Sequence, residues 1–254
     1  MRRTNAAVAG LFALMLAVLV SEPALAVVLA PCQNLTHEGN DYSACVFDLR
    51  QYRVQLFWRR ADGAPFGSLG GFTQAVDAKL GKLTFAMNAG MYHPDLRPVG
   101  LYVEHGQELV KASTSNGPGN FHMKPNGVFY IAGDTAGVLE TGRFLKSRPQ
   151  ADFATQSGPM LVIDGKLHPR FRPTGQSRKV RNGVGLRDPH TVVFAISTNP
   201  VGFTEFARLF RDAMKCPNAL FLDGSISSLY APSVSRTDSF WPAGPIVGAF
   251  ERKR

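Results

Sequence analysis

Phe221-Leu222-Asp223-Gly224-Ser225 is the stretch from which the fold of this chain can best be inferred. The apolar run that ends before Asp223 is long enough only for a buried strand, so Asp223 is expected at the carboxyl end of a core strand. Gly224 allows a sharp turn or the close approach of a ligand. An isolated buried carboxylate is very costly. Asp223 therefore either belongs to a functional site with partners or forms a simple Asp-Gly turn.

A helix is expected just before this strand, over residues 204–214. Thr204 is the predicted N-cap, and Cys216-Pro217 ends the element. Apolar residues recur there at helical spacing: Phe203, Phe206, Ala207, Phe210 and Met214. Cys216 is interpreted as a buried thiol.

Polar residues also stand beside glycine next to two other predicted strands, residues 82–87 and 160–163. Asn88 is followed by Gly90, and its amide could orient a ligand oxygen because it both donates and accepts; the alternative is a turn asparagine. Ser157 precedes Gly158 but lacks the Gly-x-Ser-x-Gly frame of hydrolase nucleophiles. Binding is therefore favoured over nucleophilic attack for Ser157.

Arg181 enters a fourth cluster, Arg181-Asn182-Gly183-Val184-Gly185. A guanidinium offers a fixed fork of donors that suits phosphate or carboxylate, although a surface arginine is the plainer interpretation. Asn126-Gly127 alone would be a hairpin turn. His122 has no identifiable partner and is interpreted as structural.

Strands dominate the pattern, and no regular alternation of strand and helix is visible. We expect an α+β fold, a single mixed domain with a mostly antiparallel or mixed sheet and few helices. Residues 45–58 are expected to form a hairpin, because the phase of apolar residues shifts at Arg50-Gln51.

The net charge is +9 over 254 residues, which favours anionic partners. No long basic run and no basic-aromatic repeat occurs, so nucleic acid is not an expected partner. The plainer interpretation of the charge is solubility. The oligomeric state is left open.

The N-terminus has the three parts of an export signal. Met1-Arg2-Arg3 is positive, residues 6–20 are apolar, and Ala24-Leu25-Ala26 has the small-x-small form of a cleavage site. We expect residues 1–26 to be a signal peptide, with residues 27–254 as the mature, periplasmic or secreted domain. An uncleaved anchor is disfavoured because the apolar run is short for a bilayer span.

Export permits disulfides, and Cys32 and Cys45 lie 13 positions apart. We expect them to be bonded. No cysteine or histidine pair has zinc-site spacing. No cofactor is expected, and the sequence leaves a divalent cation open.

At these clusters the chain resembles the phosphodiester glycosidase family, which includes the enzyme that uncovers mannose 6-phosphate on lysosomal proteins. The matching pieces occur in the family's order and are residues 88–92, 124–129, 156–160, 181–185 and 222–225. Five pieces in order are fairly specific, whereas one would not be. The resemblance implies a mixed α/β domain in which the clusters line one pocket. It also implies that the protein cleaves a sugar-1-phosphodiester at its glycosidic bond.

The resemblance also suggests roles for individual residues. Asp223 and Arg181 are expected to be catalytic, and the residues expected to bind the substrate are Asn88, Gly90, Asn126, Ser157, Gly158, Gly224 and Ser225. Glu104 and Asp188 are possible second carboxylates. The family commonly has Asp-Gly-Gly-Gly-Ser where this chain has Asp223-Gly224-Ser225, which suggests a bacterial exported subgroup.

The substrate that follows is an anionic sugar phosphodiester or glycan, with a role in envelope or exopolysaccharide metabolism. The rival interpretation is a non-catalytic glycan-binding or envelope scaffold protein.

Overall fold

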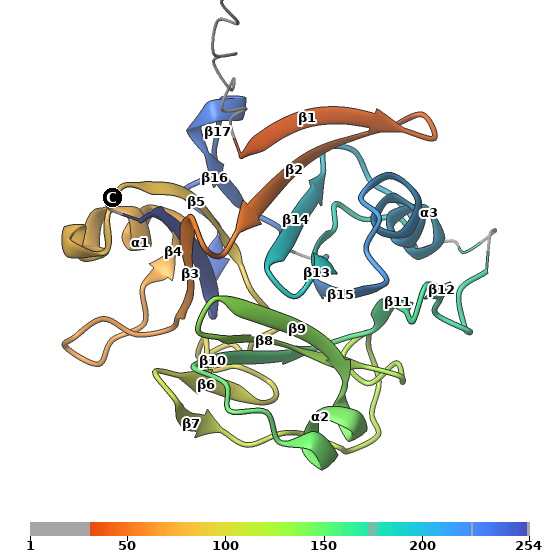
Figure 1. Ribbon diagram of the computed structural model, residues 1–254, viewed down its shortest axis with the longest axis horizontal. Coiled ribbons are helices and arrows are strands. Elements are labelled where there is room, and N and C mark those ends of the chain that lie inside the picture. The colour runs from red at the N-terminus through yellow and green to blue at the C-terminus, as the bar shows by residue number, and fades with distance from the viewer. Residues whose placement is uncertain (1–30, 173–174, 176, 225, 253–254) are drawn as a thin grey trace, which may run out of the picture.

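A computed structural model describes residues 31–172, 175, 177–224 and 226–252 of the chain (Figure 1). Its largest sheet has the strand order β1-β2-β14-β13-β15-β11-β12. The strands are β1 (Cys32–His37), β2 (Asn40–Asp48), β11 (Met160–Ile163), β12 (Lys166–Leu167), β13 (Asn182–Asp188), β14 (Thr191–Ser197) and β15 (Asn218–Asp223). The sheet therefore combines the start of the described chain with its second half.

Two five-stranded sheets and a two-stranded ribbon complete the β structure. One sheet, β17-β16-β5-β19-β3, contains β3 (Tyr52–Phe57), β5 (Leu83–Asn88), β16 (Leu229–Ala231), β17 (Arg236–Thr237) and β19 (Ile246–Glu251). The other, β7-β6-β10-β8-β9, contains β6 (Tyr102–Glu104), β7 (Gln107–Val110), β8 (Gly127–Ala132), β9 (Thr135–Glu140) and β10 (Phe153–Ser157). The ribbon pairs β4 (Gly67–Ser68) with β18 (Pro242–Ala243).

Helical structure is sparse. The α-helices are α1 (Leu69–Ala75), α2 (Thr141–Ser147) and α3 (Phe203–Arg208), with 3-10 turns at Ala78–Leu80 and Pro232–Val234 and a π-helical turn at Leu209–Ala213. Within the described residues, the paired strands of these sheets run antiparallel. The predicted α+β class is confirmed. No helix among the described residues is long and apolar enough to cross a membrane.

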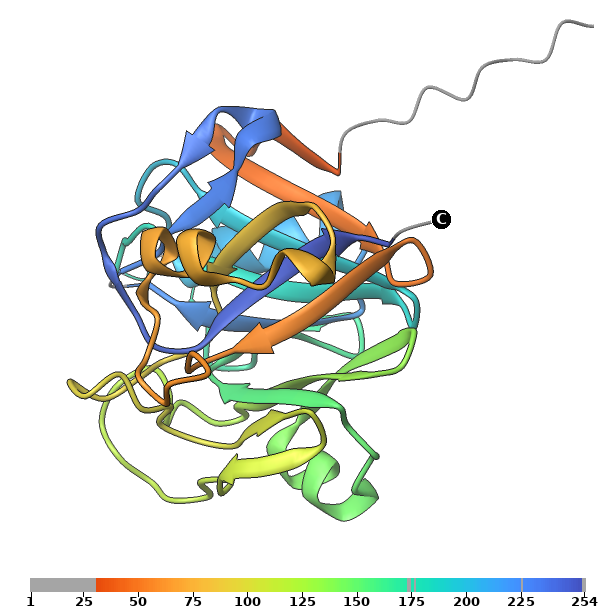
Figure 2. The same ribbon diagram turned by 90° about the vertical axis from the view of Figure 1, so that its left-hand side faces the viewer.

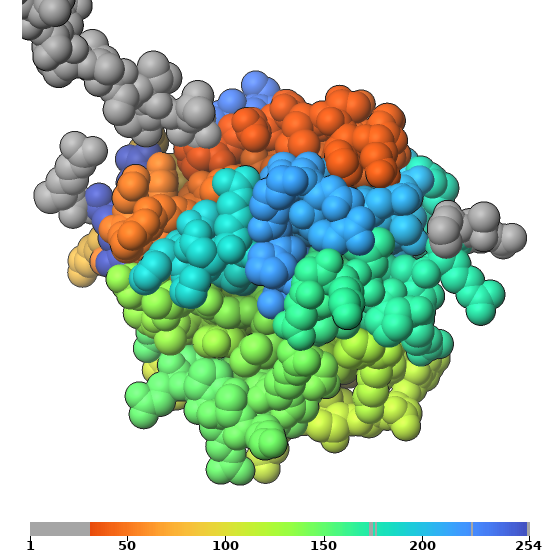
Figure 3. Space-filling view, turned by 45° about the vertical axis from the view of Figure 1, so that its right-hand side comes forward, coloured from red at the N-terminus to blue at the C-terminus, as the bar shows by residue number. Residues whose placement is uncertain are grey.

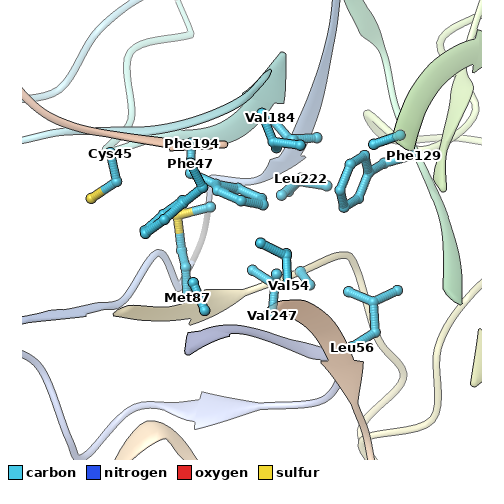
Figure 4. Close-up of a cluster of buried hydrophobic side chains, with 14 of the residues drawn as sticks. Cys45, Phe47, Val54, Leu56, Met87, Phe129, Val184, Phe194, Leu222 and Val247 are labelled. Carbon is cyan, nitrogen blue, oxygen red and sulfur yellow. The ribbon is translucent and has the colours of Figure 1, made fainter. Parts of the chain in front are cut away.

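The main core lies between the seven-stranded sheet and the sheet that contains β3, β5 and β19, and it also includes residues of the sheet that contains β8, such as Phe129 (Figure 4). Phe47 and Phe85 approach from opposite sheets, with ring centroids 5.3 Å apart, and Phe85 stacks on Phe194 at 5.0 Å. Each fully buried ring of this kind contributes about 1.5–3 kcal/mol to stability. The two sheets are therefore held face to face by aromatic packing.

The opposite face of the seven-stranded sheet is covered by α3 and the π-helical turn. A Cβ on Gly183 would lie 3.2 Å from a ring carbon of Phe206, and one on Gly185 would lie 2.7 Å from Phe210. These glycines of the fourth cluster are needed because the helix packs so closely on β13. Tyr42 of β2 stacks against Phe206, and the space-filling view shows the β1–β2 hairpin against the segment that contains α3 (Figure 3).

The predicted hairpin over residues 45–58 is wrong. β2 pairs with β1 and β14, whereas β3 pairs with β19 in another sheet. The chain turns at Arg50-Gln51 and crosses to the far side of the core. The phase shift arises because Phe47 and Val54 face the same core from opposite sides.

The helix near residue 204 begins one position earlier than predicted. Its N-cap is Gly202, whose backbone N donates to Glu205 Oε2 at 2.8 Å. The Thr204 hydroxyl instead donates to the backbone O of Arg172 at 2.9 Å. The predicted N-cap at Thr204 is therefore wrong.

The predicted disulfide is present between Cys32 and Cys45, which face each other across the β1–β2 pair. For a loop of this length the chain-entropy model gives a stabilisation of about 3 kcal/mol. Cys216 is a buried free thiol, as expected.

One buried histidine makes stability depend on pH. His168 is 2% exposed and stacks on Phe171, and its Nδ1 accepts from the backbone N of Arg170 at 3.2 Å. Burial, with a smaller effect of the Arg170 charge, lowers the pKa of His168 to about 4. Because this lies below the ordinary value, the contribution of neutral His168 is complete above the unfolded-state pKa and is lost as pH falls through the folded-state pKa.

We therefore expect the free energy of unfolding to fall by up to about 3 kcal/mol between pH 7 and pH 4 through His168 alone. In His168→Asn an amide oxygen can replace Nδ1 but does not titrate, so the pH dependence should be flatter by this amount. Urea unfolding at pH 7, 5.5 and 4 measures it, with His105→Asn at an exposed position as the control. An unchanged slope in His168→Asn would contradict the assignment.

Candidate active site

The three larger sheets bring their strand ends together at one place, near the centre of Figure 1. Asn88 ends β5, Asp223 ends β15 and Ser157 ends β10, while Asn182 begins β13. Because β13 and β15 are antiparallel, Asn182 lies directly opposite Asp223. These residues, far apart in sequence, thus converge, but of the four residues predicted to share one concave site only Asp223 lines the cleft, whereas Asn88, Ser157 and Arg181 are fully buried.

A buried hydrogen-bond network joins these strand ends. Asn182 Nδ2 donates to Asn88 Oδ1 at 2.7 Å and to the Asn88 backbone O at 2.9 Å, and the backbone N of Asp223 donates to Asn182 Oδ1 at 2.7 Å. Asn88 Oδ1 also accepts from the backbone N of Ser228. These bonds fix which amide atom of Asn88 faces which partner.

The orientation of Asn88 determines what the Asp223 carboxylate meets. Asn88 Nδ2 donates to Asp223 Oδ2 at 3.1 Å, and the backbone N of Gly224 donates to Asp223 Oδ1 at 2.6 Å. Donors on both oxygens stabilise the ionised carboxylate and hold it in one orientation. Asp223 is 7% exposed, so its fixed carboxylate reaches solvent through a narrow opening.

That opening leads to a cleft of about 490 Å³. Its described lining residues are Met91, Tyr92, Val99, Pro118, Gly119, Asn120, Phe121, His122, Asp223, Gly224 and Ile226. The volume lies in the range of small-ligand sites, and the walls combine apolar and polar groups in similar measure. Burial, and to a lesser extent the Asp223 charge, raises the pKa of Tyr92 to about 12, so Tyr92 stays a neutral phenol whose hydroxyl donates to the backbone O of Pro242 at 2.7 Å.

A larger groove of about 1080 Å³ lies beside α2 and the β6–β7 hairpin. None of the predicted site residues that the structure describes lines it. The smaller cleft at the strand ends is therefore the better candidate.

Several expected substrate-binding residues support the cleft from behind. Ser157 is fully buried, and its hydroxyl donates to the backbone O of Leu222 at 3.0 Å. Asn126 Nδ2 donates to the backbone O of Phe121, which lines the cleft. A Cβ on Gly158 would lie 2.6 Å from Cβ of Asn126, so a glycine is required there.

Gly90 supports the site in the same way. Its φ is +154°, and a Cβ there would lie 2.9 Å from the Thr155 hydroxyl. Of the residues expected to bind substrate, Gly224 lines the cleft, whereas Ser225 lies outside the described residues, as does the predicted signal peptide.

Arg181 lies directly behind the cleft wall. Its side chain is fully buried, and the guanidinium carbon lies 3.7 Å from the Phe203 ring centroid. Nε donates to the backbone O of Val201 and Nη2 to that of Ser177. Nη1 has no hydrogen-bond partner among the described residues, and a Cβ on Gly224 would lie 3.3 Å from it. Burial lowers the pKa of Arg181 to about 10, so it remains a cation at neutral pH.

The two possible second carboxylates are not at the cleft. Asp188 ends β13, and Asn182 begins it, so the two are separated by roughly 20 Å of strand. Glu104 accepts a hydrogen bond from the Tyr102 hydroxyl, and burial raises its pKa. Asp223 is thus the one carboxylate among the described residues that line the cleft.

The phosphodiester glycosidase family model matches residues 81–248 of the chain, which contain every residue of this network. The chain belongs to the phosphodiester glycosidase family. The resemblance inferred from the five clusters is confirmed.

The family assignment is accompanied by one curated relative and by similar folds. YigE, an uncharacterized protein of Escherichia coli (strain K12), is 38% identical over 178 residues, which are 70% of this chain and 69% of the relative. The catalytic domain of zebrafish N-acetylglucosamine-1-phosphodiester alpha-N-acetylglucosaminidase, auto-inhibited by its pro-peptide, aligns with a TM-score of 0.55 and 16% identity over 87% of this chain and 82% of that one. A hypothetical protein from Synechocystis aligns with a TM-score of 0.56 and 13% identity over 87% of this chain and 61% of that one. At these identities the two structures establish a shared fold.

Four polar side chains of the cleft and its network belong to residues that were not predicted as site residues from the sequence: Tyr92, Asn120, His122 and Asn182. Asn182 and Tyr92 stand inside matched clusters, so their position was a usable signal. His122 was interpreted as structural, but it lines the cleft, and its Nδ1 lies 3.2 Å from the backbone O of Ser115. A carbonyl only accepts, so Nδ1 carries the proton of this bond.

The network predicts the effect of adding a charge at Asn88. In Asn88→Asp one oxygen can still accept from Asn182, but the other meets Asp223 Oδ2 where an amide donor stood at 3.1 Å. The like charge raises the pKa of the pair in the folded state. The destabilisation relative to wild type should then be small near pH 4 and grow to about 3 kcal/mol by pH 7.5.

Urea unfolding at pH 4.5 and 7.5 measures this difference. Asn88→Ala is the control, because it removes the bonds of the Asn88 side chain without adding a charge, so its penalty should change with pH much less than that of Asn88→Asp. An equal penalty for Asn88→Asp at both pH values would show that Asn88 and Asp223 are not coupled.

Proposed function

We propose that this protein is an exported hydrolase that cleaves the glycosidic bond of a sugar-1-phosphodiester, in envelope or exopolysaccharide metabolism. The observation that carries the proposal is the Asp223 carboxylate, fixed by Asn88 and Gly224 at the cleft. The family assignment supports the reaction class. The zebrafish enzyme with the same fold is named for a sugar-1-phosphodiester substrate, which is consistent with this class.

The reaction breaks the bond between the sugar C1 and the phosphate oxygen, and the oxygen of water forms a new bond to C1. The leaving group departs as a phosphate monoester, whose second pKa is about 6, so it needs little protonation at neutral pH. Asp223 then acts on the sugar side, by stabilising positive charge on the ring or by accepting a proton from the attacking water. A single carboxylate among the described residues of the cleft suits this division.

The negative charge of the phosphodiester requires compensation. Arg181 is a cation buried directly behind Gly224. In a site of low dielectric constant, a fixed charge one layer behind the wall still acts on the ligand. His122 lines the cleft and supplies a further nitrogen. We assign Arg181 an electrostatic role rather than a direct clamp.

The test is hydrolysis of a panel of sugar 1-phosphodiesters by the purified protein. Asp223→Asn keeps the size of the side chain and removes its charge, so turnover should fall by about 100-fold or more. Asp188→Asn, at the distant end of β13, is the matched control and should behave as wild type. Arg181 variants discriminate poorly, because they also break the bonds to Val201 and Ser177.

The alternative is a glycan-binding or scaffold protein. Unchanged turnover of a verified substrate in Asp223→Asn would make Asp223 a turn residue. Binding of glycans without cleavage of any phosphodiester would favour the alternative.

Export rests on the tripartite start of the sequence and on the Cys32–Cys45 bond, which is typical of oxidising compartments. We expect the protein recovered from the envelope or the medium to begin at Val27 and to contain one free thiol, Cys216. Intact-mass measurement with and without thiol alkylation determines both. A full-length mass, or three free thiols, would contradict export in this form.

A further inference from the structure

Two adjacent aromatic side chains lie in solvent close to the cleft. Phe240 is 95% exposed and Trp241 is 63% exposed, far more than the other large exposed hydrophobic residues among those described, Leu109 and Leu145 at 48% and 38%. Single exposed apolar residues are common. Two exposed aromatic residues next to each other in the sequence are a candidate binding surface.

The exposure of this pair is fixed by the bonds on either side of it. The backbone O of Ser239 accepts from the backbone N of Gly70, at 3.2 Å, and the backbone O of Pro242 accepts from the Tyr92 hydroxyl at 2.7 Å. Pro242 also pairs with Ser68 in the β4–β18 ribbon. In Figure 2 this dark blue segment passes the end of α1. The chain is therefore anchored immediately before and after the two rings, which lowers the entropy cost of binding to them.

We call residues 239–244, which include the two rings, the aromatic tip. Tyr92 connects this tip to the cleft. It lines the cleft and holds Pro242, and a Cβ on Gly244 would lie 2.6 Å from Tyr92 Cβ. Trp241 is the residue before Pro242, so its Cα lies about 3.8 Å from that of Pro242. A ligand that extends out of the cleft past Tyr92 would therefore approach the segment that carries the two rings.

We propose that Phe240 and Trp241 form an outer subsite that stacks a further, uncharged sugar ring of the substrate. This inference rests on the proposed function and makes the substrate a phosphodiester that carries an oligosaccharide. The C–H faces of a pyranose are apolar and pack on the negative face of an aromatic ring. Aromatic rings offer that area with few rotatable bonds.

The charge of the tip favours sugar over a lipid surface. Residues 239–244 contain no charged side chain, and the neighbouring Asp238 is paired with Arg236 at 3.0 Å. Interfacial anchors combine aromatic residues with lysine and arginine. The tip is uncharged, as the hydroxyl-rich edge of a neutral sugar is.

A binding test that does not depend on catalysis uses the two tryptophans of the chain. Trp58 is 5% exposed, so iodide should quench Trp241 almost alone. Maltohexaose, cellohexaose and chitohexaose are the probes, and at least one should protect Trp241 from iodide in both the wild type and Asp223→Asn. Protection in Asp223→Asn separates this subsite from the proposed chemistry.

A kinetic test compares a monosaccharide 1-phosphodiester with one that carries additional neutral sugars. The double variant Phe240→Ser, Trp241→Ser should raise KM for the long substrate by about 3–10-fold per ring and leave the short substrate unchanged. Phe240→Tyr with Trp241→Phe keeps both rings and should restore most of the affinity. Thermal unfolding verifies that the exposed substitutions leave the fold intact.

The proposal is overturned if no hexasaccharide protects Trp241 and the double variant treats both substrates alike. It is also overturned if only phospholipid vesicles, neutral or anionic, shift the Trp241 emission, because the tip is then a membrane contact.

Discussion

The pairing of Asn182 with Asn88 and with the backbone of Asp223 is the constraint on which the site depends. These amides are buried where strands from two sheets end, and an unsatisfied group there would cost about 1–3 kcal/mol. They satisfy one another across the boundary, so the sheets must meet in a single register. The same bonds occupy Asn88 Oδ1 and so direct Asn88 Nδ2 to donate to the Asp223 carboxylate. The same set of hydrogen bonds therefore docks the two sheets and orients the Asp223 carboxylate.

Arg181 illustrates how a charge can be held in an apolar layer. Phe203 and Phe221 flank the guanidinium, and backbone oxygens accept hydrogen bonds from Nε and Nη2. Aromatic faces attract a cation without competing for its hydrogen bonds. Burial of the charge still opposes ionisation, as its lowered pKa indicates. The arrangement suits a site in which an anion is bound nearby for part of the time.

The sequence correctly predicted the features that are indicated by residues close together in the chain. The strand end at Asp223, the disulfide and the convergence of Asn88, Ser157 and Asp223 follow from apolar runs, cysteine spacing and polar interruptions. The sheet to which each strand belongs could not be predicted in this way. Alternation of apolar residues indicates which face of β3 is buried but not which strand pairs with β3. No role was predicted for the glycines that follow Arg181, and the structure shows that Gly183 and Gly185 make room for Phe206 and Phe210. The loop over residues 118–122, which lines the cleft, was not predicted to do so, because no periodic pattern encodes it.

The placement of β2 and β3 shows that the region matched by the family model is smaller than the unit that forms the complete sheets. The family match begins at residue 81, after both strands, yet β2 is the neighbour of β14 and β3 is the neighbour of β19. A fragment restricted to residues 81–248 would leave two long apolar edges open to any other strand. We expect such a fragment to self-associate through those edges, because β2 and β3 would no longer cover them. The first strands of the chain therefore protect the protein against aggregation.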